Sequence, residues 1–298
     1  MKIIENRKKY FALSAVIITV GLGTMIANAS AGKGALNWDV EFTGGTSMEI
    51  DFGEAYEVET LEAIIEEATG QASPHIQQVM GTNGAEIKLQ QIDSPARVAL
   101  MQGVRESYPR AELKEVSDIS GTISGEMQQA AIQATLIASV AMLLYISVRF
   151  RDLRAGGSAI LALIHDVLVV LAAYAVFRIP VNNTFIAVLL TILGYSINST
   201  IVIFDRVREN KEHFTPQQAA EKIDKSIGQT LARSINTSLT TLFTVGAIYV
   251  LGVSSIREFA LPMMIGIIAG AYSSICISGS IWYTLLPRGE ERTKSAEI

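Results

Sequence analysis

The feature that most constrains this chain is a series of six apolar stretches, each long enough for the ~17–25 residues that a helix needs to cross a bilayer. Hydrophobic residues make up 49% of its 298 residues, and the mean hydropathy is +0.34. Both values are high for a soluble domain of this size. We therefore predict an α-helical polytopic membrane protein with six transmembrane helices, at Phe11–Ala29, Ala130–Ile146, Ser158–Phe177, Phe185–Phe204, Ile235–Val253 and Phe259–Leu286.

The first apolar stretch has two interpretations. It follows Lys2, Arg7, Lys8 and Lys9 and ends in Ala27-Asn28-Ala29, a pattern that also fits a secretory signal with its cleavage site. A signal core spans about 7–15 apolar residues, and this run is slightly longer. We therefore expect an uncleaved anchor.

Lysine and arginine residues orient the predicted helices, because short loops rich in them stay on the cytoplasmic side. The N-terminal segment carries four, the loop around Arg151 three, the 205–233 segment six and the C-terminal tail three. The opposite loops contain only Arg178 and Arg257. Both termini are therefore expected in the cytoplasm.

The long segment between the first two helices is predicted to be an acidic outer domain. Residues 30–129 contain 6 Lys/Arg and 17 Asp/Glu, a net charge of -11, and the orientation places them outside. The patterns predict strands at Thr46–Phe52, His75–Met80, Ala85–Ile92 and Ala111–Ile119, and helices at Glu57–Thr69 and Ser94–Tyr108, with Ser94 as the N-cap. This β-α-β-β-α-β order is that of an α+β ferredoxin-like domain.

The predicted organisation therefore has four parts. Residues 1–29 form the cytoplasmic N-terminus and first helix, and 30–129 form the extracytoplasmic ferredoxin-like domain. Residues 130–286 form a five-helix membrane region with a cytoplasmic loop at 205–233, and 287–298 form a cytoplasmic tail. Within that loop, Thr215-Pro216 favours a helix start, and Ile223, Ile227 and Leu231 suit a helix lying along the membrane surface.

Composition excludes several classes of function. The single cysteine, Cys276, cannot form an internal disulfide, and His75, His165 and His213 lack the spacing of metal ligands. The net charge is -5 and no basic run is present. We expect no metal, no cofactor and no nucleic acid partner.

Small residues recur at every fourth position of the last predicted helix, at Gly266, Gly270, Ser274 and Ser278. In lipid, such a row lets two helix backbones approach closely. The row predicts a helix contact, either within this chain or with a partner.

Polar residues at membrane depth provide the candidate ion site. His165-Asp166 lies near the middle of the third helix, where a carboxylate costs about 2.5–3.5 kcal/mol. Asp166 either has a function or forms a hydrogen-bonded clamp between helices. Polar residues also line the fourth and fifth helices, at Thr191, Tyr195, Asn198, Ser199, Arg233, Asn236, Thr237, Thr240, Thr241 and Thr244.

These polar residues need not all be functional. The threonine hydroxyls can bond to their own helix backbone. Arg233 either serves function or reaches the cytoplasmic interface. Asp205-Arg206, which follow the fourth helix, are equally consistent with a solvated continuation of that helix.

Three segments together resemble the SecF family. They are Val40-Glu41-Phe42-Thr43-Gly44-Gly45-Thr46, His165-Asp166-Val167 and the run from Leu193 to Asn210, LGYSINSTIVIFDRVREN, which is highly specific. The resemblance implies a membrane subunit that pairs with SecD in a twelve-span assembly similar to the resistance-nodulation-division transporters. It also implies a bacterial plasma membrane location and assistance to the SecYEG channel in late export of unfolded secretory proteins, driven by a proton or sodium gradient.

The chain departs from the family pattern at one central position. Most members have Asp after the Asn of the fourth-helix motif, but this chain has Ser199, whereas Arg233 matches the expected arginine. Serine cannot take up a proton near neutral pH. Three sources of coupling remain: a SecD carboxylate, Asp166, or a cation held by Asn198 and Ser199 oxygens.

The resemblance also points to residues involved in conformational change, namely Gly44, Gly45, Gly194, Asp205 and Arg206. The Gly44-Gly45 pair suits a pivot or a tight turn into a strand. Gly121 and Gly125 supply freedom for a hinge before the second helix. In the proposed mechanism, the packed first and second helices transmit motion to residues 30–129.

Two rival functions fit parts of the pattern. Six spans and an outer domain would also suit half of a twelve-span exporter of lipids or drugs, which would not associate with SecD and SecYEG. An intramembrane enzyme would need a nucleophile with its base, or a metal site, and neither His165-Asp166 nor Ser199 has the other parts nearby in sequence. We do not expect an enzyme.

Overall fold

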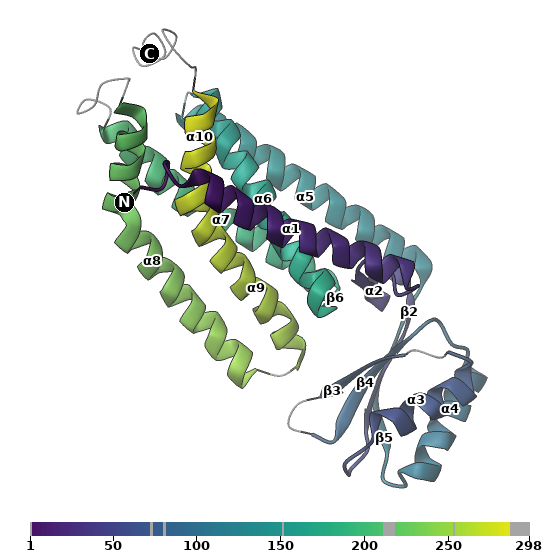
Figure 1. Cartoon of the computed structure of the whole chain (residues 1–298). Coiled ribbons are helices and arrows are strands. Elements are labelled where there is room, and N and C mark those ends of the chain that lie inside the picture. Colours follow the sequence, from purple (N-terminus) through teal and green to yellow (C-terminus); the bar gives the residue numbers. More distant parts are fainter. Residues whose placement is uncertain are drawn as a thin grey trace.

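The computed structural model describes residues 2–71, 74–79, 82–150, 152–210, 218–252 and 254–286. A bundle of long helices carries a smaller unit of strands and helices at one end, and the N-terminus lies toward the other (Figure 1). Six helical segments are long and apolar enough to cross a membrane, which confirms the predicted number. They are α1 (Arg7–Ser30), α5 (Gly121–Phe150), α6 (Leu153–Phe177), α7 (Asn183–Glu209), α8 (Ala219–Leu251) and a last span made of three pieces.

The last span is not one regular helix. It consists of α9 (Ser254–Tyr272), the π-helical segment η3 (Ser273–Ser278) and α10 (Gly279–Leu285). The apolar pattern of the sequence carries no sign of this change. π-helical turns inside α-helices often mark functional sites.

The helices differ in how much of each is covered by the rest of the chain. In the most apolar window, 50% of α6, 50% of α7 and 56% of the last span is buried, against 11% of α1, 6% of α5 and 17% of α8. α6, α7 and the last span therefore form the centre. The other three helices leave long apolar faces for lipid or for a partner.

The smaller unit is built on one antiparallel sheet. Its strands β2 (Gly45–Asp51), β3 (His75–Val79), β4 (Gly84–Leu89) and β5 (Glu112–Ile119) lie in the order β3-β4-β2-β5. Helix α3 (Val58–Thr69) follows β2, and α4 (Ser94–Ser107) follows β4. Each predicted strand and helix of this region is confirmed, with small differences at the ends.

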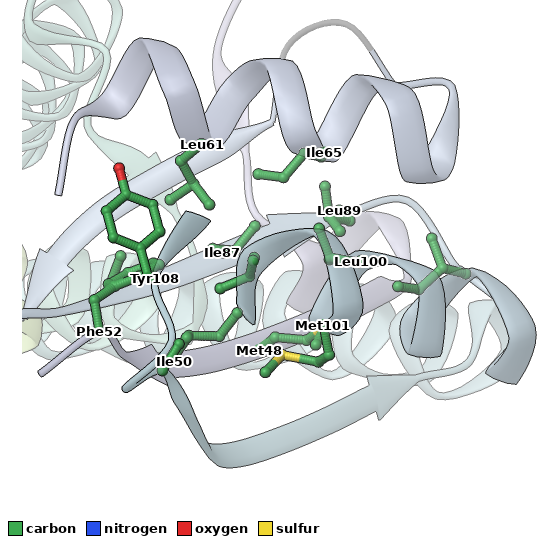
Figure 2. Packing of buried hydrophobic residues seen from close by; sticks show 14 residues of the cluster. Met48, Ile50, Phe52, Leu61, Ile65, Ile87, Leu89, Leu100, Met101 and Tyr108 are labelled. Carbon is green, nitrogen blue, oxygen red and sulfur yellow. The ribbon is translucent and has the colours of Figure 1, made fainter. Parts of the chain in front are cut away.

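One face of the sheet packs against both helices. Alternation along β2 buries Met48 and Ile50, with Phe52 just beyond the strand. Leu61 and Ile65 of α3 and Leu100 and Met101 of α4 lie on the same core (Figure 2). This core belongs to the smaller unit alone, so the unit has its own source of stability.

Three local expectations are corrected. The N-cap of α4 is Asp93, not Ser94, because the Asp93 side chain accepts a hydrogen bond from Ala96 N at 2.9 Å. Most of 205–233 is helix instead of loop, since α7 continues to Glu209 and α8 begins at Ala219. The surface helix at Ile223 is instead the first part of α8, while Thr215-Pro216 and the tail 287–298 lie outside the described residues.

Two short strands join the smaller unit to the bundle. β1 (Asn37–Trp38) pairs in parallel with β6 (Pro180–Val181), which follows the end of α6. The four-residue helix α2 (Val40–Thr43) packs on α5, and Asn183 N donates to Glu41 Oε2 at 2.6 Å. The sheet is thus held to the bundle through the segment that precedes β2.

A buried ion pair reinforces this junction. Lys88 of β4 lies 2.7 Å from Asp39, and their side chains are 11% and 1% exposed. Burial opposes the charged form of Lys88, but the attraction of Asp39 outweighs it and raises the pKa of Lys88. Burial and the Lys88 charge lower the pKa of the neighbouring His75, so its imidazole is neutral at neutral pH.

The two connections between sheet and bundle touch each other. Gly44 has a φ of 75°, and a Cβ there would lie 3.3 Å from the Cα of Gly121, where β5 passes into α5. A Cβ on Gly45, whose φ is 154°, would lie 2.3 Å from Leu89 O. Both glycines are therefore required by backbone geometry and close approach.

The expected pairing of the first and second helices is wrong. Within the described residues, α1 packs along α6, and its contacts with α5 are sparse. A Cβ on Gly21 of α1 would lie only 2.1 Å from the Cβ of Ala172, so the glycine lets the two backbones meet. Besides the direct passage of β5 into α5, the bundle therefore reaches the sheet through α6 and β6.

We predict that Lys88→Met loosens the attachment of the sheet. It leaves Asp39 buried and uncompensated, which typically costs about 3–5 kcal/mol. Thermal unfolding and limited proteolysis of the purified protein should show an earlier transition and faster cleavage between residues 30 and 129. Lys114→Met is the control, because Lys114 pairs with Glu112 at the surface; equal behaviour of the two variants would contradict the prediction.

Candidate functional site

Asp166 lies at the point where the three central helices meet. It is fully buried near the middle of α6. Its Oδ2 accepts hydrogen bonds from Ser196 of α7 and from Ser273 of η3, the latter at 2.8 Å. Its Oδ1 lies 2.9 Å from Nδ1 of His165. One carboxylate thus ties α6, α7 and the last span together.

These contacts explain how a carboxylate is tolerated at this depth. An unsatisfied buried charge is very costly, and three polar partners replace the hydration that Asp166 loses. The serine donors are small, so they fit between closely packed helices. The arrangement holds the three helices together. Its hydrogen bonds also depend on the charge of Asp166, because a carboxylate accepts hydrogen bonds from both hydroxyls, whereas a protonated acid must also donate one.

The π-helical segment positions the serines of the last span. Ser273 reaches Asp166, whereas Ser274 donates to Ser196 O at 3.2 Å and lies 3.0 Å from Thr200 Oγ1. Adjacent side chains of one segment thus contact different polar groups of the core. Ser278 bonds back to Ser274 O at 2.8 Å.

The small residues of the last span contact α7. A Cβ on Gly266 would lie 2.0 Å from Cδ1 of Ile192, and a Cβ on Gly270 would lie 3.0 Å from Cβ of Ser196. Of the two alternatives open from the sequence, the contact lies within this chain. The same stretch of α7 carries Ser196, which donates to Asp166 of α6.

Asn198, Ser199 and Arg233 are not part of the Asp166 cluster. Ser199 is buried, but Asn198 and Arg233 are both exposed on the surface of this chain. Tyr195 OH donates to Ser238 Oγ at 3.3 Å, and α7 and α8 run antiparallel, so Asn198 and Arg233 lie toward the same end of this helix pair. The structure does not bring Asn198 and Ser199 together on one face.

The polar residues of α8 form an exposed surface, which we call the α8 polar stripe: Arg233, Asn236, Thr237, Thr240 and Thr244. The threonine hydroxyls bond to their own helix, as predicted; Thr244 donates to Thr240 O at 3.0 Å and Thr237 to Arg233 O at 2.9 Å. These hydrogen bonds reduce the free-energy cost of placing the hydroxyls in lipid. Within the described part of the chain, the side chains of Arg233 and Asn236 form no such hydrogen bond to their own helix.

Asp205 and Arg206 lie at the end of α7 and form separate contacts. Asp205 pairs with Arg149 of α5 at 2.5 Å, and Arg206 Nε donates to Gln229 Oε1 of α8 at 2.8 Å. Gly194 faces open space, since nothing lies within 4 Å of a Cβ built there. Within the described residues, no group of three His, Cys, Asp or Glu could hold a metal ion.

Comparisons with known proteins agree on one family. The family described as "Protein export membrane protein SecD/SecF, C-terminal" matches residues 100–288. The protein translocase subunit SecF of Acidaminococcus fermentans is 33% identical over 94% of this chain and 95% of its own length. The chain belongs to the SecF family.

Longer relatives contain a SecF-like part. The crystal structure of SecDF from Thermus thermophilus matches 95% of this chain with a TM-score of 0.82 and 32% identity, and this match covers 38% of that chain. The SecDF translocase subunit of Bacillus subtilis is 31% identical over 98% of this chain and 39% of its own length. No enzyme is named among these relatives.

Sequence reasoning found Asp166 and His165 but missed Ser196 and Ser273. Both missed serines lie in helices that were predicted correctly, but serine is common in membrane helices and carries little signal. Ser196 could have been found by its place one turn before Thr200 in the SecF-like run. Ser273 could not, because its position depends on the π-helical segment.

We predict that Ser273→Ala destabilises this SecF-family protein by about 1–3 kcal/mol, the usual cost of leaving a buried acceptor with too few donors. Ser280→Ala is a matched control in the same span, because Ser280 bonds only to its own helix, at Cys276 O. Thermal unfolding in detergent should give a lower midpoint for Ser273→Ala alone. Identical midpoints would show that Asp166 does not depend on this donor.

Proposed function

We propose that this chain is an accessory subunit of the Sec protein translocase that pairs with SecD and uses an ion gradient to assist late export through SecYEG. The observation that carries the gradient part is the buried Asp166 carboxylate, which joins three helices through His165, Ser196 and Ser273. The names of the SecF and SecDF relatives support the translocase part.

In this proposal, protonation of Asp166 shifts the balance between two packings of the bundle. The ionised carboxylate accepts from both serine hydroxyls and holds η3 and α7 against α6. A protonated carboxyl group loses part of that acceptor capacity and leaves a buried serine hydroxyl in need of another partner. Movement of the last span relative to α6 then lowers the free energy of the bundle.

The shift reaches the sheet through the end of α6. Arg178, which ends α6, donates to Lys33 O at 2.7 Å and to Gly34 O at 2.9 Å. The next residues form β6, whose partner β1 leads directly to Asp39 and its ion pair with Lys88. Movement of α6 would therefore change the position of the sheet, with Gly44, Gly45 and Gly121 at the pivot.

SecD is the partner that best fits the exposed polar surface. The α8 polar stripe and Asn198 would be unfavourable against lipid, so a second helical subunit should cover them. A carboxylate on that subunit would match Arg233, the one charged member of the stripe. Relatives in which both parts form one SecDF chain favour the same pairing.

We also propose the topology and the fold class of the smaller unit. Residues 30–129 lie outside the cytoplasm, both termini lie inside, and 287–298 are a cytoplasmic tail. The strand order β3-β4-β2-β5 with two helices on one face supports a ferredoxin-like fold. The bacterial plasma membrane is the expected location, and unfolded secretory proteins are the expected clients.

Cysteine labelling tests this topology. We predict that Glu66→Cys, on the exposed side of α3, reacts with an impermeant maleimide added to intact spheroplasts. Arg208→Cys, near the end of α7, should react only after the membrane is opened. Both residues are exposed, so access to reagent is the only difference expected. The reverse pattern would overturn the orientation.

Export into inverted membrane vesicles tests the coupling. We predict that Asp166→Asn loses the gradient-dependent part of export and keeps the part driven by ATP alone, because Asn cannot change its charge. Thr191→Ala is the control, since Thr191 is exposed and bonds only to Ala187 O of its own helix. The assay measures export with the proton or the sodium gradient collapsed separately.

Unchanged gradient-dependent export in Asp166→Asn would remove Asp166 from the mechanism. Ser199→Asp, which restores the residue usual in the family, separates the alternatives. If Asp166→Asn is inactive and Ser199→Asp restores export to that variant, the carboxylate can act from either helix. Copurification without SecD or SecYEG would contradict the proposed partnership.

A further inference from the structure

Two buried polar atoms outside the hydrogen bonds already described lie on neighbouring helices. Ser14 of α1 is 6% exposed and His165 of α6 is 8% exposed. Within the described residues, neither Ser14 Oγ nor His165 Nε2 has a hydrogen-bond partner. Nearly all buried polar atoms in proteins bond to protein or to ordered water. The two atoms therefore point to a ligand that the chain does not supply.

The packing of α1 on α6 places these residues at the same level. The two helices run parallel, because Gly21 meets Ala172 and, further along both, Asn28 Nδ2 donates to Ala175 O at 3.1 Å. Ser14 and His165 each lie seven residues before the Gly21–Ala172 contact. Seven residues are close to two helical turns, so both side chains return to the shared face.

Tyr272 of α9 closes the third side of this junction. Its ring centroid lies 6.0 Å from that of His165, and its phenol is next to the Ser14 hydroxyl. Tyr272 OH donates to Tyr10 O at 2.8 Å, which leaves the phenol oxygen free to accept. Three polar groups from α1, α6 and α9 thus converge, which is the number that a buried water usually binds.

We propose that a water molecule binds between Ser14 Oγ, His165 Nε2 and Tyr272 OH and forms the proton exit from Asp166. The role of this water in coupling rests on the proposed function, whereas the existence of the water site does not. In this proposal His165 relays protons between the water and the carboxylate, and Ser14 is a positioning residue for the water.

The tautomer of His165 suits this role. With Asp166 ionised, Nδ1 carries the proton that faces Oδ1, so Nε2 of the neutral ring is an acceptor for the water. When Asp166 is protonated and the ring carries its proton on Nε2, the carboxyl proton passes to Nδ1 and the Nε2 proton passes to the water. One O–H and one N–H bond break, one N–H and one O–H bond form, and the products are a hydronium ion, the other neutral tautomer and an ionised carboxylate.

The surrounding groups make this exit one-sided. On the side toward the N-terminus lie Tyr272, Tyr10 and Ser14. On the other side, Val170, Ile192 and Ile267 belong to one cluster and are at most 1% exposed. The buried polar member of that cluster, Tyr174, lies two turns beyond Asp166. In this conformation the proton therefore leaves toward the end of the bundle that carries the N-terminus.

The test uses two variants of the same shape. Ser14→Val removes the hydroxyl, and Ser14→Thr keeps it with a similar volume. The purified complex with SecD is exposed to radiolytic hydroxyl radicals, which label buried side chains only where water is bound, and mass spectrometry measures labelling of His165 and Tyr272. We expect several-fold less labelling in Ser14→Val than in Ser14→Thr. Equal labelling in the two variants would overturn the water site.

Export assays then separate this inference from the proposed function. We expect gradient-dependent export to fall in Ser14→Val and to persist in Ser14→Thr. Reduced labelling with unchanged export would overturn the exit route, while loss of export in Asp166→Asn would still support the function. If Ser14→Val and Ser14→Thr both fail to copurify with SecD, the same comparison is made between Ser14→Ala and the natural chain.

Discussion

The structure depends on one constraint: a carboxylate in the middle of a membrane helix must find its partners inside the protein. Asp166 is fully buried, and the chain supplies His165, Ser196 and Ser273 as its polar partners. The length of these side chains sets how closely α7 and the last span approach α6. Gly266 and Gly270 permit that approach, and the π-helical segment turns Ser273 toward the carboxylate. The central packing of the bundle is therefore organised around one buried carboxylate.

Much of this architecture could be predicted from the sequence, for a simple reason. Membrane spans must be long and apolar, and a half-buried sheet must alternate, so both patterns are visible in single residues. The six spans and the strands of the smaller unit follow from these patterns. Contacts between helices do not, because lipid and protein are equally apolar surroundings. The expected pairing of the first and second helices failed on this point, and Gly21 reveals the α1–α6 contact only in three dimensions.

Only the most unusual residue of the candidate site, Asp166, and its neighbour His165 could be predicted from the sequence. An aspartate at mid-membrane stands out against an apolar background, whereas serines do not. Asn198, Ser199 and Arg233 were grouped with Asp166 because all are polar and share the SecF-like motifs. The structure separates them, with Asp166 at the centre of the chain and Asn198 and Arg233 exposed on one side. Helical spacing shows which residues share a face, but it does not show which face is inside.

In the proposed mechanism, the size of the driving force limits how the smaller unit can be attached. One elementary charge crossing 100 mV provides about 2.3 kcal/mol, which can bias only packings that differ by a few kcal/mol. A broad apolar interface between sheet and bundle would exceed that scale and hold the unit fixed. The junction here is instead narrow: a two-residue strand pair, the short helix α2, the passage of β5 into α5 and one buried ion pair between Lys88 and Asp39. In the proposed mechanism these contacts would transmit a displacement of α6, and they are few enough to rearrange, because the contacts of a two-residue strand pair can be exchanged without unfolding either part.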